Sequence, residues 1–267
     1  MPFILVHPAA ALPFYRGLGR YGVLSALIIG SLTPDMHYFL PLAIDRNATH
    51  SAAGLIWFCW PVGIALYLLY HLILKLPLAV LLPPVITSRV VPYLKPGCLP
   101  DVSWSAVFLS LLIGATTHIV WDAFTHQHAP VVMAVPGLRS VWFTLGNYPL
   151  AGYVVLQQAS NVLGFALLST WFWRWLRAQP AQTIAPPDPG LSSGERHIIL
   201  GTVLFLPMMV AAVVMRGALT APVELTLLSG TFKQATLLGM SSASLVALTY
   251  SLLWHIRARR RRNLLLQ

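Results

Sequence analysis

The sequence predicts an all-α fold, a polytopic bundle of transmembrane helices with about six full spans and a short N-terminal helix that dips into the membrane. The first observation is composition: 57% of the 267 residues are apolar or aromatic, only 9% are charged, and the mean hydropathy is +0.72. A soluble domain of this size needs more polar surface, so lipid must cover part of the chain. The second observation is that several apolar stretches reach the roughly 20 residues that a helix needs to cross a hydrocarbon core.

Six stretches have the length and apolar character of spanning helices, and loops rich in proline or polar residues separate them. They cover residues 22–40, 53–74, 104–126, 148–173, 197–216 and 235–256. The segment from His7 to Tyr15 is apolar but too short to cross, and Arg16 and Arg20 close it. This segment is therefore predicted to be the dipping helix.

The spans are expected to group into two parts joined by a linker. Residues 1–177 form a helical membrane domain, residues 178–196 form a linker rich in proline, glycine and serine, and residues 197–267 form a two-helix tail with a basic end. No internal repeat is visible in the sequence, which argues against a transporter built from duplicated halves.

The net charge of +10 follows the pattern of a membrane protein and not that of a nucleic-acid-binding protein. Basic residues occupy short loops and a C-terminal run of arginines at positions 257 and 259–262. This asymmetry predicts a multi-pass protein of the cytoplasmic membrane whose C-terminus is cytoplasmic. The two cysteines, Cys59 and Cys98, are too few for a disulfide framework or a cysteine-based zinc site.

Acidic residues are scarce, so their positions are informative. Asp35 and Asp122 lie within predicted spans, where an ionisable side chain is costly unless it faces the bundle interior with a partner. The predicted topology brings both aspartates and the histidines that flank them to the outer leaflet. These residues are expected to form a functional site there.

The spacing of His118, Asp122 and His126 is the sharpest local signal. Residues four apart stack along one face of a helix, within reach of a single cation. Imidazole and carboxylate ligands suit zinc, manganese, iron or nickel, and a bound water at an open coordination position becomes a nucleophile near neutral pH. Eight residues in these segments could serve as ligands, namely His7, Asp35, His37, His50, His118, Asp122, His126 and His128.

Structural explanations stay open for each part of this set. His118 and Asp122 could form a buried hydrogen bond that locks two helices together. Asp35 follows Pro34 and could cap a helix end. His50 lies among Asn47, Thr49 and Ser51, which are all cap-forming residue types.

The order of motifs resembles a known family. The chain opens with Met-Pro-Phe and His-Pro-Ala-Ala, continues with Gly-Ser-Leu-Thr-Pro-Asp and Thr-His-Ser, and then has His-Ile-Val-Trp-Asp-Ala-Phe-Thr-His. Over roughly residues 1–175 it resembles a family of bacterial membrane proteins of unknown function. That family is in turn similar to inner-membrane metal-dependent hydrolases and, more distantly, to the zinc-dependent phospholipase C group.

The resemblance implies a set of metal-site residues. These are His7, Asp35, His50, His118 and Asp122, with His126 near them. The chain departs from the expected pattern at His37, where an acidic residue is common. It also departs in the span 148–173, where Gln157 and Gln158 stand in place of a Gln-His pair.

Together, the residues and the resemblance lead to a functional hypothesis. The chain is expected to be a membrane-bound metal-dependent hydrolase, with zinc as the preferred metal and Asp35, His118 and Asp122 as catalytic residues. Its partners would be membrane lipids, and its substrate a lipid or a lipid-linked ester or phosphoester. Two alternatives are a transporter that handles protons or metal ions, and an assembly factor in which the His-Asp pairs are structural.

Overall fold

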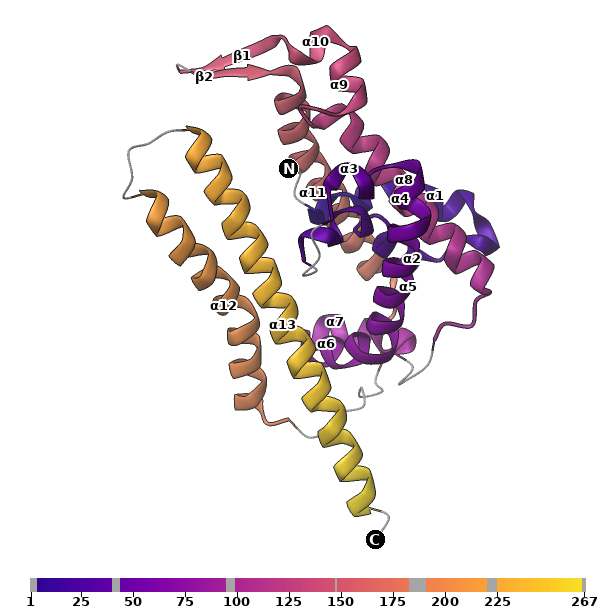
Figure 1. Ribbon diagram of the computed structural model, residues 1–267. Coiled ribbons are helices and arrows are strands. Elements are labelled where there is room, and N and C mark those ends of the chain that lie inside the picture. Colours follow the sequence, from indigo (N-terminus) through magenta and orange to yellow (C-terminus); the bar gives the residue numbers. More distant parts are fainter. Residues whose placement is uncertain are drawn as a thin grey trace. The chain divides into compact units, whose positions relative to one another are not determined.

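The computed structural model (Figure 1) describes residues 4–39, 44–94, 99–146, 148–182, 191–219 and 225–265, and their regular structure is helical apart from one β-hairpin. Cys98 and most of the predicted linker, residues 183–190, lie outside these ranges. The chain divides into two compact units. One comprises Met1–Tyr67 and Asp101–Trp175, and the other comprises Leu68–Pro100 and Leu176–Gln267.

The first unit contains short helices at its start and two long helices, α8 and α11. Its helices are the 3-10 helix Ile4–Val6, α1 Pro8–Gly17, the 3-10 helix Gly19–Tyr21, α2 Leu24–Gly30, the 3-10 helix Thr33–Tyr38, α3 Arg46–Thr49, α4 Ala52–Gly54, the π-helix Leu55–Cys59, α5 Trp60–Leu69, α8 Trp104–Thr125, α9 Pro130–Ala134, α10 Pro136–Arg139 and α11 Gly152–Ala178. The short helix predicted from His7 to Tyr15 is therefore present as α1.

Four helical runs among the described residues are long and apolar enough to cross a membrane. They are Ala52–Leu81, Trp104–Ala134, Gly194–Arg216 and Gly230–Arg261. They match four of the six predicted spans, so the chain has the helices of a membrane protein, but the count of about six is not confirmed. The two remaining segments, 22–40 and 148–173, have different structures.

The segment 22–40 is broken instead of continuous. Helix α2 ends at Gly30, and a 3-10 helix follows from Thr33 to Tyr38. Pro34 lacks a backbone N–H and disfavours helical geometry in the residue before it, which explains the interruption. The hydroxyl of Thr33 donates to the carbonyl of Gly30 and so replaces part of the lost backbone pairing. The break places Asp35 in a tight turn of buried residues.

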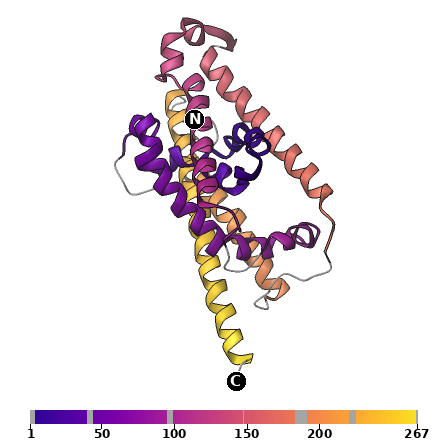
Figure 2. The same cartoon turned by 90° about the vertical axis from the view of Figure 1, so that its right-hand side faces the viewer.

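The segment 148–173 begins in a β-hairpin that the sequence analysis did not predict. Strands β1 Val141–Leu145 and β2 Tyr148–Ala151 pair antiparallel, and Gly146 turns the chain with φ +60°. A run of β-branched and aromatic residues followed by Gly-Asn is a hairpin signal. Helix α11 starts directly after the hairpin and continues without interruption, as the second view shows (Figure 2).

Close packing of α2 against α8 fixes the centre of the first unit. Gly30 and Gly114 meet the facing backbone so closely that an added methyl group would overlap it. Small residues let two helices approach in this way. The Ser110 hydroxyl also accepts a bond from the amide of Val23 and donates to the carbonyl of Tyr21, which ties the start of α2 to α8. This contact sets the position of the residues that follow α2.

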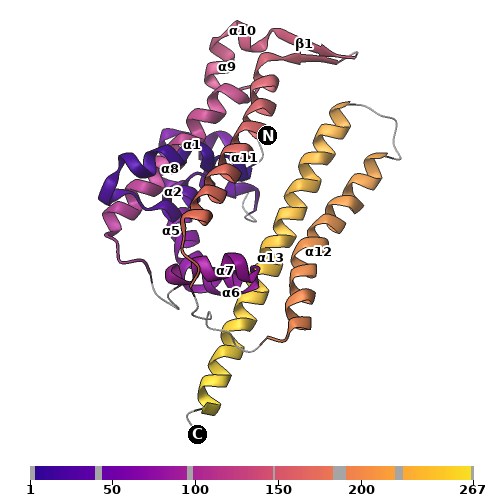
Figure 3. The same ribbon diagram turned by 180° about the vertical axis from the view of Figure 1, so that it is seen from behind.

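The second unit is built on two long helices. Its elements are the π-helix Tyr70–Leu74, α6 Lys75–Leu81, α7 Pro84–Val90, the 3-10 helix Val91–Tyr93, α12 Ser193–Leu219 and α13 Leu225–Leu265. Helices α12 and α13 run antiparallel and side by side, which both views make visible (Figures 1 and 3). The Tyr250 hydroxyl donates to the carbonyl of Pro77, so α13 is joined to α6.

Candidate metal centre

Four side chains converge inside the first unit. Asp35 comes from the 3-10 helix Thr33–Tyr38, His50 follows α3, and His118 and Asp122 lie one turn apart on α8. Each offers one ligand atom, and these atoms all lie within 4.8 Å of one another. Asp35, His118 and Asp122 are buried and His50 is partly buried. The predicted segments therefore meet, although their sequence separation is large.

The atoms that face one another in this cluster are not hydrogen-bonded. The Nε2 atoms of His50 and His118 both lie 3.4 Å from Oδ2 of Asp122. Asp35 is more distant, with Oδ1 3.5 Å from Nε2 of His50 and Oδ2 3.8 Å from Nε2 of His118. Both Nε2 atoms and Oδ1 of each aspartate are buried with no hydrogen-bond partner in the described residues. Buried polar atoms normally have partners, so this arrangement needs an explanation.

Backbone carbonyls fix the tautomers of two of the histidines. The Nδ1 atom of His118 lies 2.7 Å from the carbonyl oxygen of Ser31, and Nδ1 of His50 lies 3.0 Å from that of Arg46. A carbonyl oxygen can only accept, so in the neutral ring each Nδ1 carries the proton and each Nε2 keeps its lone pair. Metal-binding histidines show this outer support, which orients the ring and raises the basicity of the ligand nitrogen.

His7 adds a third imidazole at the edge of the cluster. It immediately precedes α1, its ring stacks on that of His118 with centroids 3.6 Å apart, and its Nε2 lies 3.7 Å from Oδ1 of Asp122. Both ring nitrogens are buried without a hydrogen-bond partner among the residues described. Burial, followed by the neighbouring His118, lowers the pKa of His7 to about 3. The ring is therefore neutral at physiological pH, as a metal ligand must be.

The other histidines of the sequence pattern take outer positions. His126 ends α8, and its Nδ1 lies 3.5 Å from Oδ2 of Asp122 and 3.3 Å from the carbonyl of the same residue. His37 is buried, with Nδ1 2.9 Å from the carbonyl of Pro34. His128 is exposed. The structure brings His126 next to the cluster, but none of these three belongs to the four residues that share one centre.

Arg46 is a site residue that the sequence analysis missed. Its Nη2 donates to Oδ2 of Asp122 at 2.6 Å, and about 25% of its side chain is exposed. From the sequence it counts only as a charge in a loop, because no spacing rule joins residue 46 to residue 122. Its position puts a guanidinium between the buried carboxylate and the outside of the unit.

Comparison with known proteins gives a family but no function. The family model described as Domain of unknown function (DUF4184) matches residues 1–252. The chain belongs to this family. No curated protein and no solved structure matches it. The predicted membership of a family of unknown function is thus confirmed.

The charges of the DUF4184 site are incompletely balanced. Asp35 and Asp122 contribute two negative charges as carboxylates, and Arg46 contributes one positive charge. When all its imidazoles are neutral, which is the state that could bind a metal, the cluster carries a net charge of −1 in a largely buried position. Burying an unbalanced charge is costly, so a bound cation would stabilise this arrangement.

The carboxylates also set the protonation of His50. Burial lowers the pKa of His50, but the carboxylates of Asp122 and Asp35 outweigh this effect, and its pKa is raised. Burial likewise raises the pKa of Asp35, while His50 and His118 outweigh it and hold the pKa at about 2. Asp35 therefore stays ionised at any physiological pH, and His50 is the candidate ligand at which protons would compete with a metal.

We expect zinc affinity to fall as the pH falls below neutrality. Protonated His50 cannot bind a metal, so affinity is complete above its raised pKa and is lost below it, by about tenfold for each pH unit. His7, with its pKa of about 3, makes no contribution in this range. Competition with a chelator between about pH 5 and 8 measures the effect. An affinity that is constant over this range would contradict the assignment of His50 as a ligand.

A small cavity lies beside His7. Its volume is about 170 Å³, and Val6, His7, Trp121, Ser160 and Gly164 are among the residues that line it. Its lining is mostly apolar, with the His7 ring and the Ser160 hydroxyl as polar groups. Helix α11, where a Gln-His pair was expected, thus contributes a buried serine near the cluster. The cavity offers space for a small group next to the His7 ring.

Proposed function

We propose that the protein is a membrane-bound metal-dependent hydrolase that acts on a lipid or a lipid-linked ester or phosphoester. The observation that carries the proposal is the convergence of three imidazole Nε2 atoms and the Oδ1 atoms of two carboxylates, all of which lack hydrogen-bond partners among the described residues. If the His-Asp pairs only held helices together, this set of buried polar atoms would stay without hydrogen bonds, at a cost of about 1–3 kcal/mol for each group. A divalent cation would satisfy them together.

The residues fit zinc in donor type and number. Zinc in proteins takes nitrogen and oxygen ligands in a tetrahedral arrangement, and catalytic sites use three protein ligands with one open position. Three of the four side chains Asp35, His50, His118 and Asp122 would hold the metal, and His7 lies beside them. When bound, zinc supplies a Lewis acid and lowers the pKa of a coordinated water to near 7.

The chain's own residues would supply the remaining functions. Five donor groups exceed the three ligands of a catalytic zinc site, so a carboxylate or imidazole remains to accept and return a proton. Arg46, partly exposed beside Asp122, would pair with an anionic oxygen of the substrate. The largely apolar cavity beside His7 would exclude water from the reacting bond.

A transporter is supported less well by the same geometry. A proton or metal pathway needs a series of polar groups across the membrane. Among the described residues of the first unit, the buried groups Asp35, His118 and Asp122 instead gather in one cluster. An assembly role would require neither the fixed tautomers of His50 and His118 nor their unpaired Nε2 atoms. The enzyme hypothesis uses each of these features.

A lipid-turnover experiment tests the proposal. The protein is reconstituted with zinc into vesicles of bacterial lipid extract, and lipid species are followed by mass spectrometry. We expect zinc-dependent loss of at least one lipid class, abolished by Asp35→Asn. Asp45→Asn, at an exposed position nearby, is the matched control. Lipids that all remain intact with zinc-loaded protein would argue against lipid hydrolysis.

Replacing Arg46 should separate metal binding from turnover. Arg46→Gln removes the only permanent positive charge beside Asp122 in the described part of the site, so zinc should bind at least about tenfold more tightly. Hydrolysis should nevertheless fall by about 100-fold, because an anion-stabilising donor is lost. Calorimetric titration with zinc and the vesicle assay measure the two effects.

Arg139→Gln, at an exposed position in α10, controls for a general loss of charge and should change neither quantity. If Arg46→Gln lost its metal, the guanidinium would be a structural support of the cluster and its proposed contact with substrate would be wrong.

A further inference from the structure

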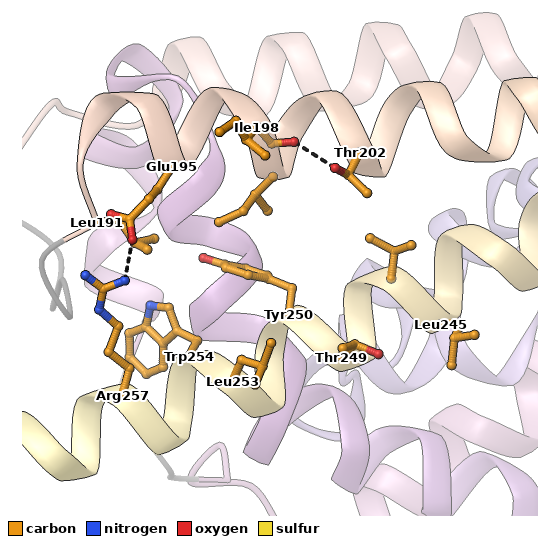
Figure 4. Close-up of a pocket in the computed structure, with 12 residues that line it drawn as sticks. Leu191, Glu195, Ile198, Thr202, Leu245, Thr249, Tyr250, Leu253, Trp254 and Arg257 are labelled. Atoms are coloured by element: carbon orange, nitrogen blue, oxygen red, sulfur yellow. Dashed lines mark hydrogen bonds and ion pairs between the residues drawn. The ribbon is translucent and has the colours of Figure 1, made fainter.

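A groove between α12 and α13 lies wholly within the second unit (Figure 4), and none of the residues that line it belongs to the candidate metal cluster of the first unit. Its volume is about 550 Å³, which falls in the range of about 300–1,000 Å³ that is typical of small-molecule sites. The walls are mostly aliphatic, with Ile198 and Ile199 from α12 and Leu245, Val246 and Leu253 from α13. The groove is thus suited to a hydrocarbon chain.

One end of the groove is charged. Nη1 of Arg257 lies 2.6 Å from Oε1 of Glu195, and this ion pair closes the end of the groove in Figure 4. Glu195 is near the start of the span Gly194–Arg216, and Arg257 is near the end of the span Gly230–Arg261. Because the helices are antiparallel, both charges lie at the same end of the helix pair. An amphiphile in the groove would therefore place its head at this end and its chain along the spans.

The charged end has an excess of positive charge. Arg196 follows Glu195, and Arg257 is followed in the same helix by further arginines at positions 259–262, while the described part of this end contributes only one acidic side chain. Clusters of four to eight basic residues next to a spanning helix attract anionic lipid headgroups. Each such charge near the membrane surface raises the affinity for anionic lipid by about fivefold.

A buried donor supplies a second, independent observation. Nε1 of Trp254 has no hydrogen-bond partner among the described residues, and Trp254 is only 6% exposed, yet it lines the groove next to Arg257. Tyr250 lines the same groove, but its hydroxyl already donates to the carbonyl of Pro77. A tryptophan N–H at the headgroup end is suited to an acceptor oxygen of a lipid.

We propose that this groove binds one anionic phospholipid, with its phosphate on Arg257 and an acyl chain between α12 and α13. Charge complementarity favours an anionic headgroup over a zwitterionic one. The site needs neither a metal nor hydrolysis, so it is independent of the function proposed above.

Native mass spectrometry of the full chain in detergent tests the proposal. Phosphatidylglycerol and phosphatidylcholine with identical acyl chains are added at equal concentration. We expect one tightly held phosphatidylglycerol for each chain, with a preference of about fivefold or more over phosphatidylcholine. Equal binding of the two lipids would overturn the proposal.

Matched variants locate the site. Arg257→Gln should remove most of the preference, whereas Arg260→Gln, in the exposed arginine run, should reduce it much less. Leu253→Trp should block the acyl chain and abolish binding, while Leu252→Trp, at an exposed neighbour outside the groove, should not.

Equal losses in the two arginine variants would mean that surface charge alone attracts the lipid, and the groove would be excluded. Unchanged binding by a folded Leu253→Trp protein would exclude it as well. Circular dichroism of each variant checks that it has folded.

Discussion

Replacing Asp122 with asparagine is expected to lower zinc affinity by more than about 100-fold. Losing a residue that only orients a metal ligand usually lowers the affinity by about 10- to 100-fold. Oδ2 of Asp122 lies 3.4 Å from Nε2 of His50 and of His118, and 2.6 Å from Nη2 of Arg46. The amide keeps the shape of the side chain but removes the charge on which these groups converge. Calorimetric titration with zinc gives the affinity, and circular dichroism reports whether the fold is kept.

Asp45→Asn is the control for the loss of one acidic charge in the same unit, because Asp45 is exposed. It should bind zinc as the wild type does. An Asp122→Asn protein that melts at a lower temperature but keeps its zinc would contradict the metal assignment. It would instead favour a purely structural His-Asp pair.

Gly30→Ala is expected to destabilise the first unit strongly. A methyl group there would overlap the carbonyl oxygen of Leu111 and lie 2.8 Å from its Cα, both of which are backbone atoms that cannot rotate away. Overpacking of this kind costs about 3 kcal/mol or more, or roughly 6–12 °C in melting temperature for a protein of this size. The shift would also move Ser31, whose carbonyl orients His118. Zinc affinity should therefore fall together with stability.

Gly137→Ala provides the comparison, because an added methyl group there meets nothing within 4 Å. Its melting temperature and zinc affinity should match those of the wild type. If Gly30→Ala were equally harmless, the close contact of α2 and α8 would not exist as described. The positions derived for Asp35 and His118 would then lose their support.

Much of the candidate site was predictable from residue types and spacing. His118 and Asp122 are one helical turn apart, and an acidic residue in an apolar stretch signals a partner. Asp35 and His50 could be grouped with these two residues only because their segments have a similar His-Asp pattern and match the family resemblance. That the four side chains meet in space depends on the tertiary structure. The structure brings these four together and places His7 against His118.

Other features depend on tertiary structure and could not be inferred in this way. Pro34 interrupts the helix in the segment 22–40. The apolar composition of this segment nevertheless resembles that of a membrane span. Composition likewise suggested a span from residue 148, where the chain is first a strand paired with Val141–Leu145. The pairing of Arg46 with Asp122 joins residues 76 positions apart. Hydropathy windows measure local composition and contain no information on such contacts.

The most direct test is the metal content of the wild-type protein, purified in detergent and reconstituted with zinc. Elemental analysis should find about one zinc ion for each chain, and X-ray absorption should show nitrogen and oxygen ligands at about 2.0–2.2 Å with no sulfur. His118→Ala, if it remains folded, should have lost this zinc. A well-folded wild-type protein that binds neither zinc nor manganese would contradict the metal centre and, with it, the proposed hydrolase.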